Sequence, residues 1–103
     1  MEQKKLLKKL QKVLEKKISV ESLYLFGSRA RGNFHAESDF DIAIISASFD
    51  HLRFLERQLL VRPLLRHVLK NAFLDVVCYT PEEYEAGKKG FLPEIIENEG
   101  IKA

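Results

Sequence analysis

Two aspartates, Asp39 and Asp41, occupy alternate positions at the start of an apolar segment. Residues two apart in a β-strand point to the same face of the sheet, so the two carboxylates would lie side by side. Adjacent carboxylates repel each other unless one is protonated or a cation lies between them. Oxygen ligands of this kind favour Mg²⁺, which proteins often hold with one or two carboxylates and the phosphate oxygens of a substrate. The pair therefore predicts a magnesium site.

A third aspartate, Asp75, is the one charged residue of the apolar segment 72–79. Burying an isolated carboxylate in such a segment is costly unless it is paired, protonated or bound to a metal. If this segment forms a strand beside the strand that contains Asp39 and Asp41, the three carboxylates converge. We predict this convergence as the main structural feature of the site.

A Gly27-Ser28 turn ends the apolar segment that precedes these aspartates, and Arg29 and Arg31 follow it. Glycine lets the backbone approach a ligand closely, and amides at the start of a helix can donate to phosphate oxygens. Ser28 would also cap a short helix, so its two roles overlap. Arg29 and Arg31 are placed to add positive charge, but Arg31 is equally compatible with a surface ion pair. Which of the two arginines points inward is left open.

Apolar periodicity predicts the elements that position these residues. An amphipathic helix is predicted over residues 2–17, and Gly32 is predicted to stop the short helix after the Gly27-Ser28 turn. Asp50 is a candidate cap for a helical segment that Pro63 kinks or divides. The other predicted elements are strands over 20–26, 39–46 and 72–79, a helical pattern over 51–71, a helix that begins at Thr80 and Pro81, and a last helix over 93–98 ended by Gly100. This alternation predicts an α/β (α+β) fold, with a small mixed sheet flanked by helices.

Composition bounds the class of protein. The chain has 103 residues, of which 46% are hydrophobic and 31% charged, so residues 1–103 are read as a single domain. No apolar run reaches the ~20 residues that cross a bilayer, and the lysine-rich start does not read as a signal peptide. Cys78 is the one cysteine, which excludes an internal disulfide and suits a cytoplasmic protein. A net charge of +2 is too mild to predict direct nucleic-acid binding.

The joint pattern resembles the nucleotidyltransferase superfamily that includes DNA polymerase β. Its members carry a Gly-Ser turn, an Asp-x-Asp in a following strand and a third acidic residue in a later strand, and residues 20–80 match this order. The sequence Gly-Ser-Arg-Ala-Arg-Gly is similar to that of the minimal nucleotidyltransferases, the MntA-type antitoxins that are partnered with HEPN-type toxins. The resemblance implies a palm-like fold and two Mg²⁺ ions bound by Asp39, Asp41 and Asp75. It also implies ATP as substrate, with its phosphates at Gly27, Ser28, Arg29 and Arg31.

By the same resemblance, the reaction is attack of an acceptor hydroxyl on the α-phosphate of a nucleoside triphosphate, with Asp75 nearest that hydroxyl. A chain this short has no second domain to shape an acceptor pocket, which suits a protein acceptor such as a HEPN-type toxin. Three alternatives stay open: a catalytic subunit that adenylylates a small molecule with a partner chain, an antitoxin that acts by contact alone, and an RNA-binding module that uses the lysine-rich first helix. The sequence does not decide the acceptor, the nucleotide preference, the number of nucleotides transferred or the oligomeric state.

Overall fold

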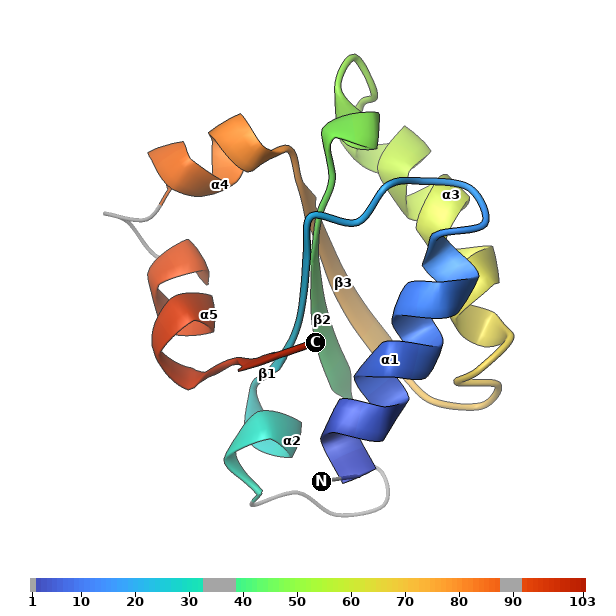
Figure 1. The fold of residues 1–103 in the computed structure, drawn as a ribbon, viewed down its shortest axis with the longest axis vertical. Helices are drawn as coiled ribbons and strands as arrows, with labels where there is room; N and C mark the ends of the chain where they lie inside the picture. Colours follow the sequence, from blue (N-terminus) through green and yellow to red (C-terminus); the bar gives the residue numbers. More distant parts are fainter. Residues whose placement is uncertain (1, 33–38, 88–91) are drawn as a thin grey trace.

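One four-stranded sheet lies between two pairs of helices in the computed structural model, which describes residues 2–32, 39–87 and 92–103 (Figure 1). Helices α1 (Glu2–Leu14) and α3 (Phe54–Arg66) cover one face of the sheet. Helices α4 (Pro81–Ala86) and α5 (Leu92–Glu99) cover the other. The predicted α/β fold with a small mixed sheet is confirmed. In the described part of the chain no helix combines the length and apolarity needed to cross a bilayer.

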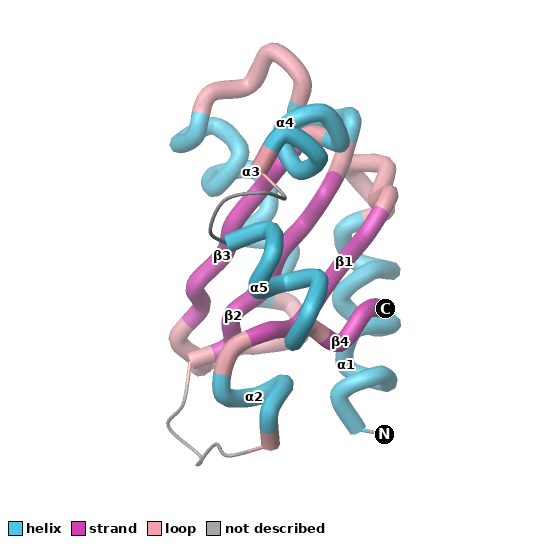
Figure 2. Tube along the Cα trace, turned by 90° about the vertical axis from the view of Figure 1, so that its left-hand side faces the viewer, coloured by secondary structure: helices cyan, strands magenta, loops and turns pink. Residues whose placement is uncertain are grey.

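The sheet brings three chain segments together at one end of its strands. Its strands are β1 (Ser22–Phe26), β2 (Phe40–Ile45), β3 (Leu74–Tyr79) and β4 (Ile101–Lys102), in the spatial order β3-β2-β1-β4 (Figure 2). Strand β1 is antiparallel to β2 and β4, whereas β2 and β3 are parallel. The end of β1 therefore lies beside the starts of β2 and β3, where Asp41 is the register partner of both Phe26 and Asp75.

Both faces of the central strands are buried, which explains why their sequences are continuously apolar. Leu25, Ile42 and Ile44 are fully buried in a core shared with the apolar faces of α1 and α3. Their neighbours along the strands, such as Ala43, are buried on the other face, where Tyr84 of α4 and Ile96 of α5 cover them. Asp41 lies on this second face, since it alternates with Ile42. The same alternation places Asp75 there, because Leu74 packs against the first core.

The start of α3 corrects two expectations. Asp50 does not cap this helix: it follows the 3₁₀ turn η1 (Ala47–Phe49), and Arg53 is the N-cap residue. The Arg53 amide donates to the Glu56 carboxylate at 2.7 Å, so the cap uses a side chain from inside the helix. Helix α3 also continues through Pro63, so of the two predicted alternatives, a kink or a division, the division does not occur.

Other predicted ends are confirmed. Thr80 caps α4, with its hydroxyl oxygen accepting from the Glu83 amide at 3.2 Å, and Pro81 is the first helical residue. The short helix α2 (Ser28–Arg31) ends before Gly32, whose φ of +82° is the left-handed conformation that glycine favours. Gly100 follows α5, and its amide donates to the Ile96 carbonyl at 2.8 Å. Strand β4 was not predicted.

Candidate active site

The three predicted carboxylates lie together at the edge of the sheet where β1 ends. Asp39 directly precedes β2, Asp41 is its second residue, and Asp75 is the second residue of β3. The parallel register pairs Asp41 with Asp75, and the two carboxyl groups lie close enough to share a proton. Asp39 is close enough to act on the charge of Asp41. The structure therefore confirms the predicted pairing of Asp41 with Asp75 and places Asp39 within electrostatic reach of Asp41.

Asp41 bears the electrostatic cost of this arrangement. Its half-buried position raises the pKa of its carboxyl group above the usual range, and the negative charges of Asp75 and Asp39 raise that pKa further. The hydrogen bond with Asp75 acts in the same direction, because it needs a proton between the two carboxylates. The positive charge of Arg31 opposes the rise. A cation among the three carboxylates would reverse it, since a nearby positive charge favours the ionised form.

Asp75 differs from expectation in one respect. We predicted a carboxylate buried among apolar neighbours, whereas Asp75 is exposed on a strand at the edge of the sheet. The desolvation cost expected for Asp75 therefore falls on Asp41 instead. An exposed carboxylate next to a half-buried one leaves Asp75 accessible to a molecule that approaches from the β3 side.

Gly27 forms the wall against which the Asp41 carboxylate rests. Its φ of +73° lies in the left-handed region, which side-chain-bearing residues rarely adopt. A Cβ atom at this position would lie 2.0 Å from Asp41 Oδ2 and 2.9 Å from Asp41 Cγ. Glycine is thus required both by the backbone and by the close approach of the carboxylate. The sequence indicated the first requirement, but the second depends on the register between β1 and β2.

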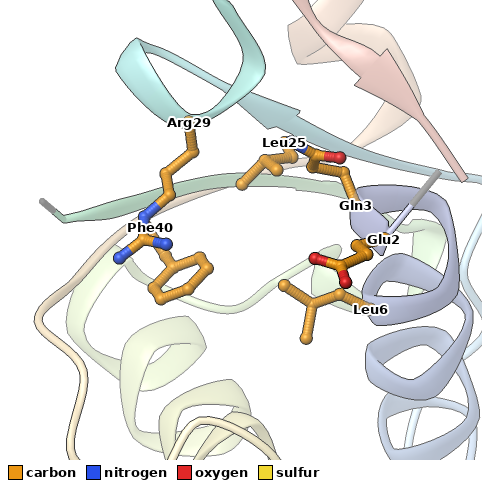
Figure 3. A pocket seen from close by; sticks show the side chains of 6 residues that line it. All are labelled: Glu2, Gln3, Leu6, Leu25, Arg29 and Phe40. Carbon is orange, nitrogen blue, oxygen red and sulfur yellow. The ribbon is translucent and has the colours of Figure 1, made fainter. Parts of the chain in front are cut away.

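The two arginines of α2 point to different places. Arg29 lies over the Phe40 ring at 4.0 Å, beside Leu25 in a cavity of about 250 Å³ on the α1 side of the sheet (Figure 3). It therefore lies on the face opposite to the carboxylates, and the prediction that it contacts phosphate is not supported by this placement. Arg31 is the arginine whose charge acts on Asp41.

Arg31 has a partner that the sequence did not reveal. Its Nη1 atom lies 3.0 Å from Glu99 Oε1 at the end of α5, in an ion pair whose side chains are both about half exposed. The predicted surface ion pair is therefore present, and it lies next to the carboxylate site. No local pattern connects residues 68 positions apart, so only the tertiary fold identifies Glu99.

Some predictions fall outside what the structure describes. The Ser28 side chain is not in the described part of the chain, and neither are residues 33–38, between the predicted helix end at Gly32 and the predicted strand over 39–46. Three tyrosines belong to the core: the Tyr84 ring stacks on Tyr24 with centroids 6.1 Å apart, and Tyr79 packs against the same cluster. Burial raises the pKa of the Cys78 thiol to about 12, as expected for a core cysteine.

Two of the carboxylates at this site have the character of metal ligands. Within residues 2–32, 39–87 and 92–103, no group of three or more His, Cys, Asp or Glu side chains lies in positions that could hold a metal ion. The pair of Asp41 and Asp75 nevertheless offers oxygen ligands whose mutual repulsion a cation would relieve. This fits Mg²⁺ that arrives with a nucleotide, because such ions take one or two carboxylates and fill their coordination with phosphate oxygens and water.

These features define a class of protein. A mixed sheet with a glycine turn beside an Asp-x-Asp strand and a third carboxylate on the parallel neighbour is the arrangement of a nucleotidyltransferase domain. The family model for polymerase β nucleotidyltransferases matches residues 8–99, and the chain belongs to this family. A comparison with curated protein sequences finds no significant match.

Solved structures agree with this assignment, and they also show that the fold alone does not determine the function. A toxin–antitoxin complex with AMP-PNP is 26% identical, with a TM-score of 0.62, over 92% of this chain and 69% of that one. A double Asp-to-Glu variant of the toxin–antitoxin MntA-HpeT is 24% identical, with a TM-score of 0.60 and the same coverage. BolA1 from Arabidopsis thaliana is 25% identical, with a TM-score of 0.58, over 76% of this chain and 94% of that one. Because BolA1 shares the fold, the functional assignment depends on the carboxylates rather than on topology.

Proposed function

We propose that the chain is a Mg²⁺-dependent nucleotidyltransferase that transfers AMP from ATP to a hydroxyl group of a protein acceptor. Membership of the family supports the reaction class. The observation that carries the proposal is the pairing of Asp41 with Asp75 at the start of β2 and β3, where burial and the charges of Asp75 and Asp39 raise the pKa of Asp41. An arrangement that disfavours its own charged state suits a site that a cation completes.

Asp39, Asp41 and Asp75 are the residues that would hold Mg²⁺, with two ions expected from the family pattern. When bound there, the metal would neutralise negative charge that develops on the attacking and leaving oxygens of the phosphoryl group. The chain's own residues bind and orient the nucleotide. Gly27 and Ser28 would contact the phosphates through backbone amides, and Arg31 would add positive charge from the end of α2.

The proposed reaction is an in-line displacement at the α-phosphorus of ATP. The acceptor oxygen forms a bond to that phosphorus while the bond to the oxygen bridging the α- and β-phosphates breaks, and pyrophosphate leaves. The hydroxyl proton needs an acceptor within hydrogen-bonding reach. We assign this role to Asp75, because it is the exposed carboxylate of the Asp41–Asp75 pair.

The acceptor we propose is a HEPN-type toxin, with the chain acting as an antitoxin that silences it by modification. The likeness to a toxin–antitoxin complex with AMP-PNP supports a toxin as partner and an adenine nucleotide as substrate. A small-molecule acceptor completed by a partner chain, or silencing by contact alone, would each give a different outcome in the experiment below.

The test follows label from [α-³²P]ATP into a purified HEPN-type toxin in the presence of Mg²⁺. We expect Asp41→Asn to reduce label transfer at least about a hundredfold, within the range seen when charge stabilisation of a transition state is lost. Asp50→Asn is the matched control, because Asp50 is a 72% exposed aspartate that lies after β2, at the other end of that strand. Asp75→Asn should reduce turnover more than ATP binding.

Undiminished transfer by Asp41→Asn would exclude this carboxylate from the reaction. A growth assay separates modification from contact: the variant with all three aspartates changed to asparagine should no longer protect cells from the toxin. Protection that persists in that variant, together with normal binding of the toxin, would favour neutralisation by contact.

A further inference from the structure

Phe73 is an exposed aromatic residue beside the carboxylate site. Its side chain is 72% exposed, which is unusual for phenylalanine. Its backbone carbonyl accepts from the Phe40 amide at 2.9 Å, so the chain is already aligned with β2 at this residue. Leu74 packs into the first core, and alternation therefore places Phe73 on the face that carries Asp75. Phe73 therefore precedes Asp75 by two residues on the same face, on the β3 side of the carboxylates.

The order of Gly27, Asp41 and Asp75 across the sheet indicates where the leaving phosphates and the attacking hydroxyl of the proposed reaction would lie. Gly27 follows β1, Asp41 lies on the central strand β2, and Asp75 lies on β3. In an in-line displacement the attacking and leaving oxygens lie on opposite sides of the phosphorus. If the β- and γ-phosphates lie at Gly27, the attacking hydroxyl must arrive from the β3 side. That side is open, because β3 is the outermost strand of the described sheet.

We infer that Phe73 contacts the protein acceptor, through an apolar side chain that neighbours the modified hydroxyl. This inference rests on the proposed nucleotidyl transfer and names the residue that selects its acceptor. An aromatic ring at the acceptor side offers a large apolar contact with little conformational entropy to lose, and such residues dominate recognition surfaces. The ring favours a polypeptide with an apolar residue next to the acceptor over a sugar or another polar small molecule.

The chain supplies a matched control for this inference. Phe54, the first residue of α3, is 74% exposed and so resembles Phe73 in type and exposure. It follows the end of β2 after a short connection, whereas Phe73 lies beside the start of that strand. Removal of the Phe54 ring changes exposed aromatic surface by a similar amount without touching the carboxylate site.

The experiment compares wild type, Phe73→Ala, Phe73→Leu and Phe54→Ala with [α-³²P]ATP and Mg²⁺. The acceptors are two tripeptides with a central tyrosine, one flanked by glycine and the other by leucine. A parallel assay without peptide follows slow release of AMP from ATP, with water as the acceptor. We expect the wild type to favour the leucine-flanked peptide in kcat/KM by about tenfold or more, as one apolar contact can provide.

Phe73→Ala should bring this preference close to one, while Phe73→Leu and Phe54→Ala should largely keep it. AMP release without peptide and the KM for ATP should change less than about twofold, since the contact is to the acceptor. A preference that survives in Phe73→Ala would overturn the inference, as would AMP release with no label on either peptide. A raised KM for ATP in Phe73→Ala would make the ring a nucleotide contact instead. Failure of the wild type both to release AMP and to label the toxin would contradict the proposed function itself.

Discussion

Replacing Gly27 with alanine tests how closely the glycine turn and the Asp41 carboxylate depend on each other. Two separate costs are expected. The backbone cost arises because Gly27 has a φ of +73°, where a side chain costs about 1–2 kcal/mol. The steric cost arises because the new Cβ would lie 2.0 Å from Asp41 Oδ2, so the carboxylate must move away from the site.

Gly32→Ala isolates the backbone cost. Gly32 has a φ of +82°, close to that of Gly27, but a Cβ atom there would meet nothing within 4 Å. We expect Gly32→Ala to lower the free energy of unfolding by about 1 kcal/mol, after the smaller entropy of the unfolded chain is allowed for. Gly27→Ala should lower it by roughly 1–3 kcal/mol more, the usual cost of forcing extra atoms into a packed place.

A double-mutant cycle assigns the difference to Asp41. In an Asp41→Ala background the carboxylate is gone, and the cost of Gly27→Ala should fall to about that of Gly32→Ala. Thermal unfolding followed by circular dichroism suffices as the assay, since about 1 kcal/mol shifts the Tm of a domain of this size by roughly 4–8 °C. Equal losses for Gly27→Ala and Gly32→Ala in the wild-type background would refute the proposed close contact between Gly27 and Asp41.

Three further predictions concern the same fold. Because the pKa of Asp41 is raised in the folded state, the ionised carboxylate lowers the stability of the fold above that pKa. Asp41→Asn should therefore unfold at a higher temperature than wild type at neutral pH. This difference in Tm should disappear as the pH falls through the pKa of Asp41 in the folded state to its pKa in the unfolded state. A gap that widens in acid would contradict this. Cys78, with a pKa raised to about 12 mainly by burial, should react with a thiol reagent at pH 8 about a thousandfold more slowly in the native protein than in denaturant. Thr80→Ala removes the hydroxyl that caps α4 and should cost about 1 kcal/mol in urea unfolding, whereas Thr80→Ser should be nearly neutral.

Local chemistry predicted most of the elements. Continuous apolar runs gave strands that are buried on both faces, as Leu25 and Phe26 are, and the Thr80-Pro81 pair marked the start of α4 correctly. The meeting of Asp41 and Asp75 followed from one assumption, that the third strand lies beside the second, and the parallel register confirms it. These features depend on side-chain types and short spacings, which a sequence contains directly.

What the sequence did not predict depends on contacts between distant segments. Strand β4 has two residues, Ile101 and Lys102, and exists because β1 offers it an open edge to pair with. The sequence does not distinguish Arg29 from Arg31. In the fold, Arg29 packs over the Phe40 ring on one face of the sheet, whereas Arg31 forms an ion pair with Glu99 on the other. The exposure of Asp75 likewise follows from the position of β3 in the sheet, which no residue pattern reveals.

The residues at this edge are better explained by function than by stability. BolA1 shares the fold, so the sheet and its helices do not by themselves require a nucleotidyltransferase site. Asp41 is held where its charge is disfavoured, Gly27 adopts a left-handed conformation that leaves room for it, and Phe73 exposes an apolar ring two residues before Asp75. None of these features by itself raises the free energy of unfolding. A cation, a triphosphate and an apolar acceptor would together give all three a favourable partner, and Asp41→Asn provides the decisive comparison, since it should gain stability while losing transfer.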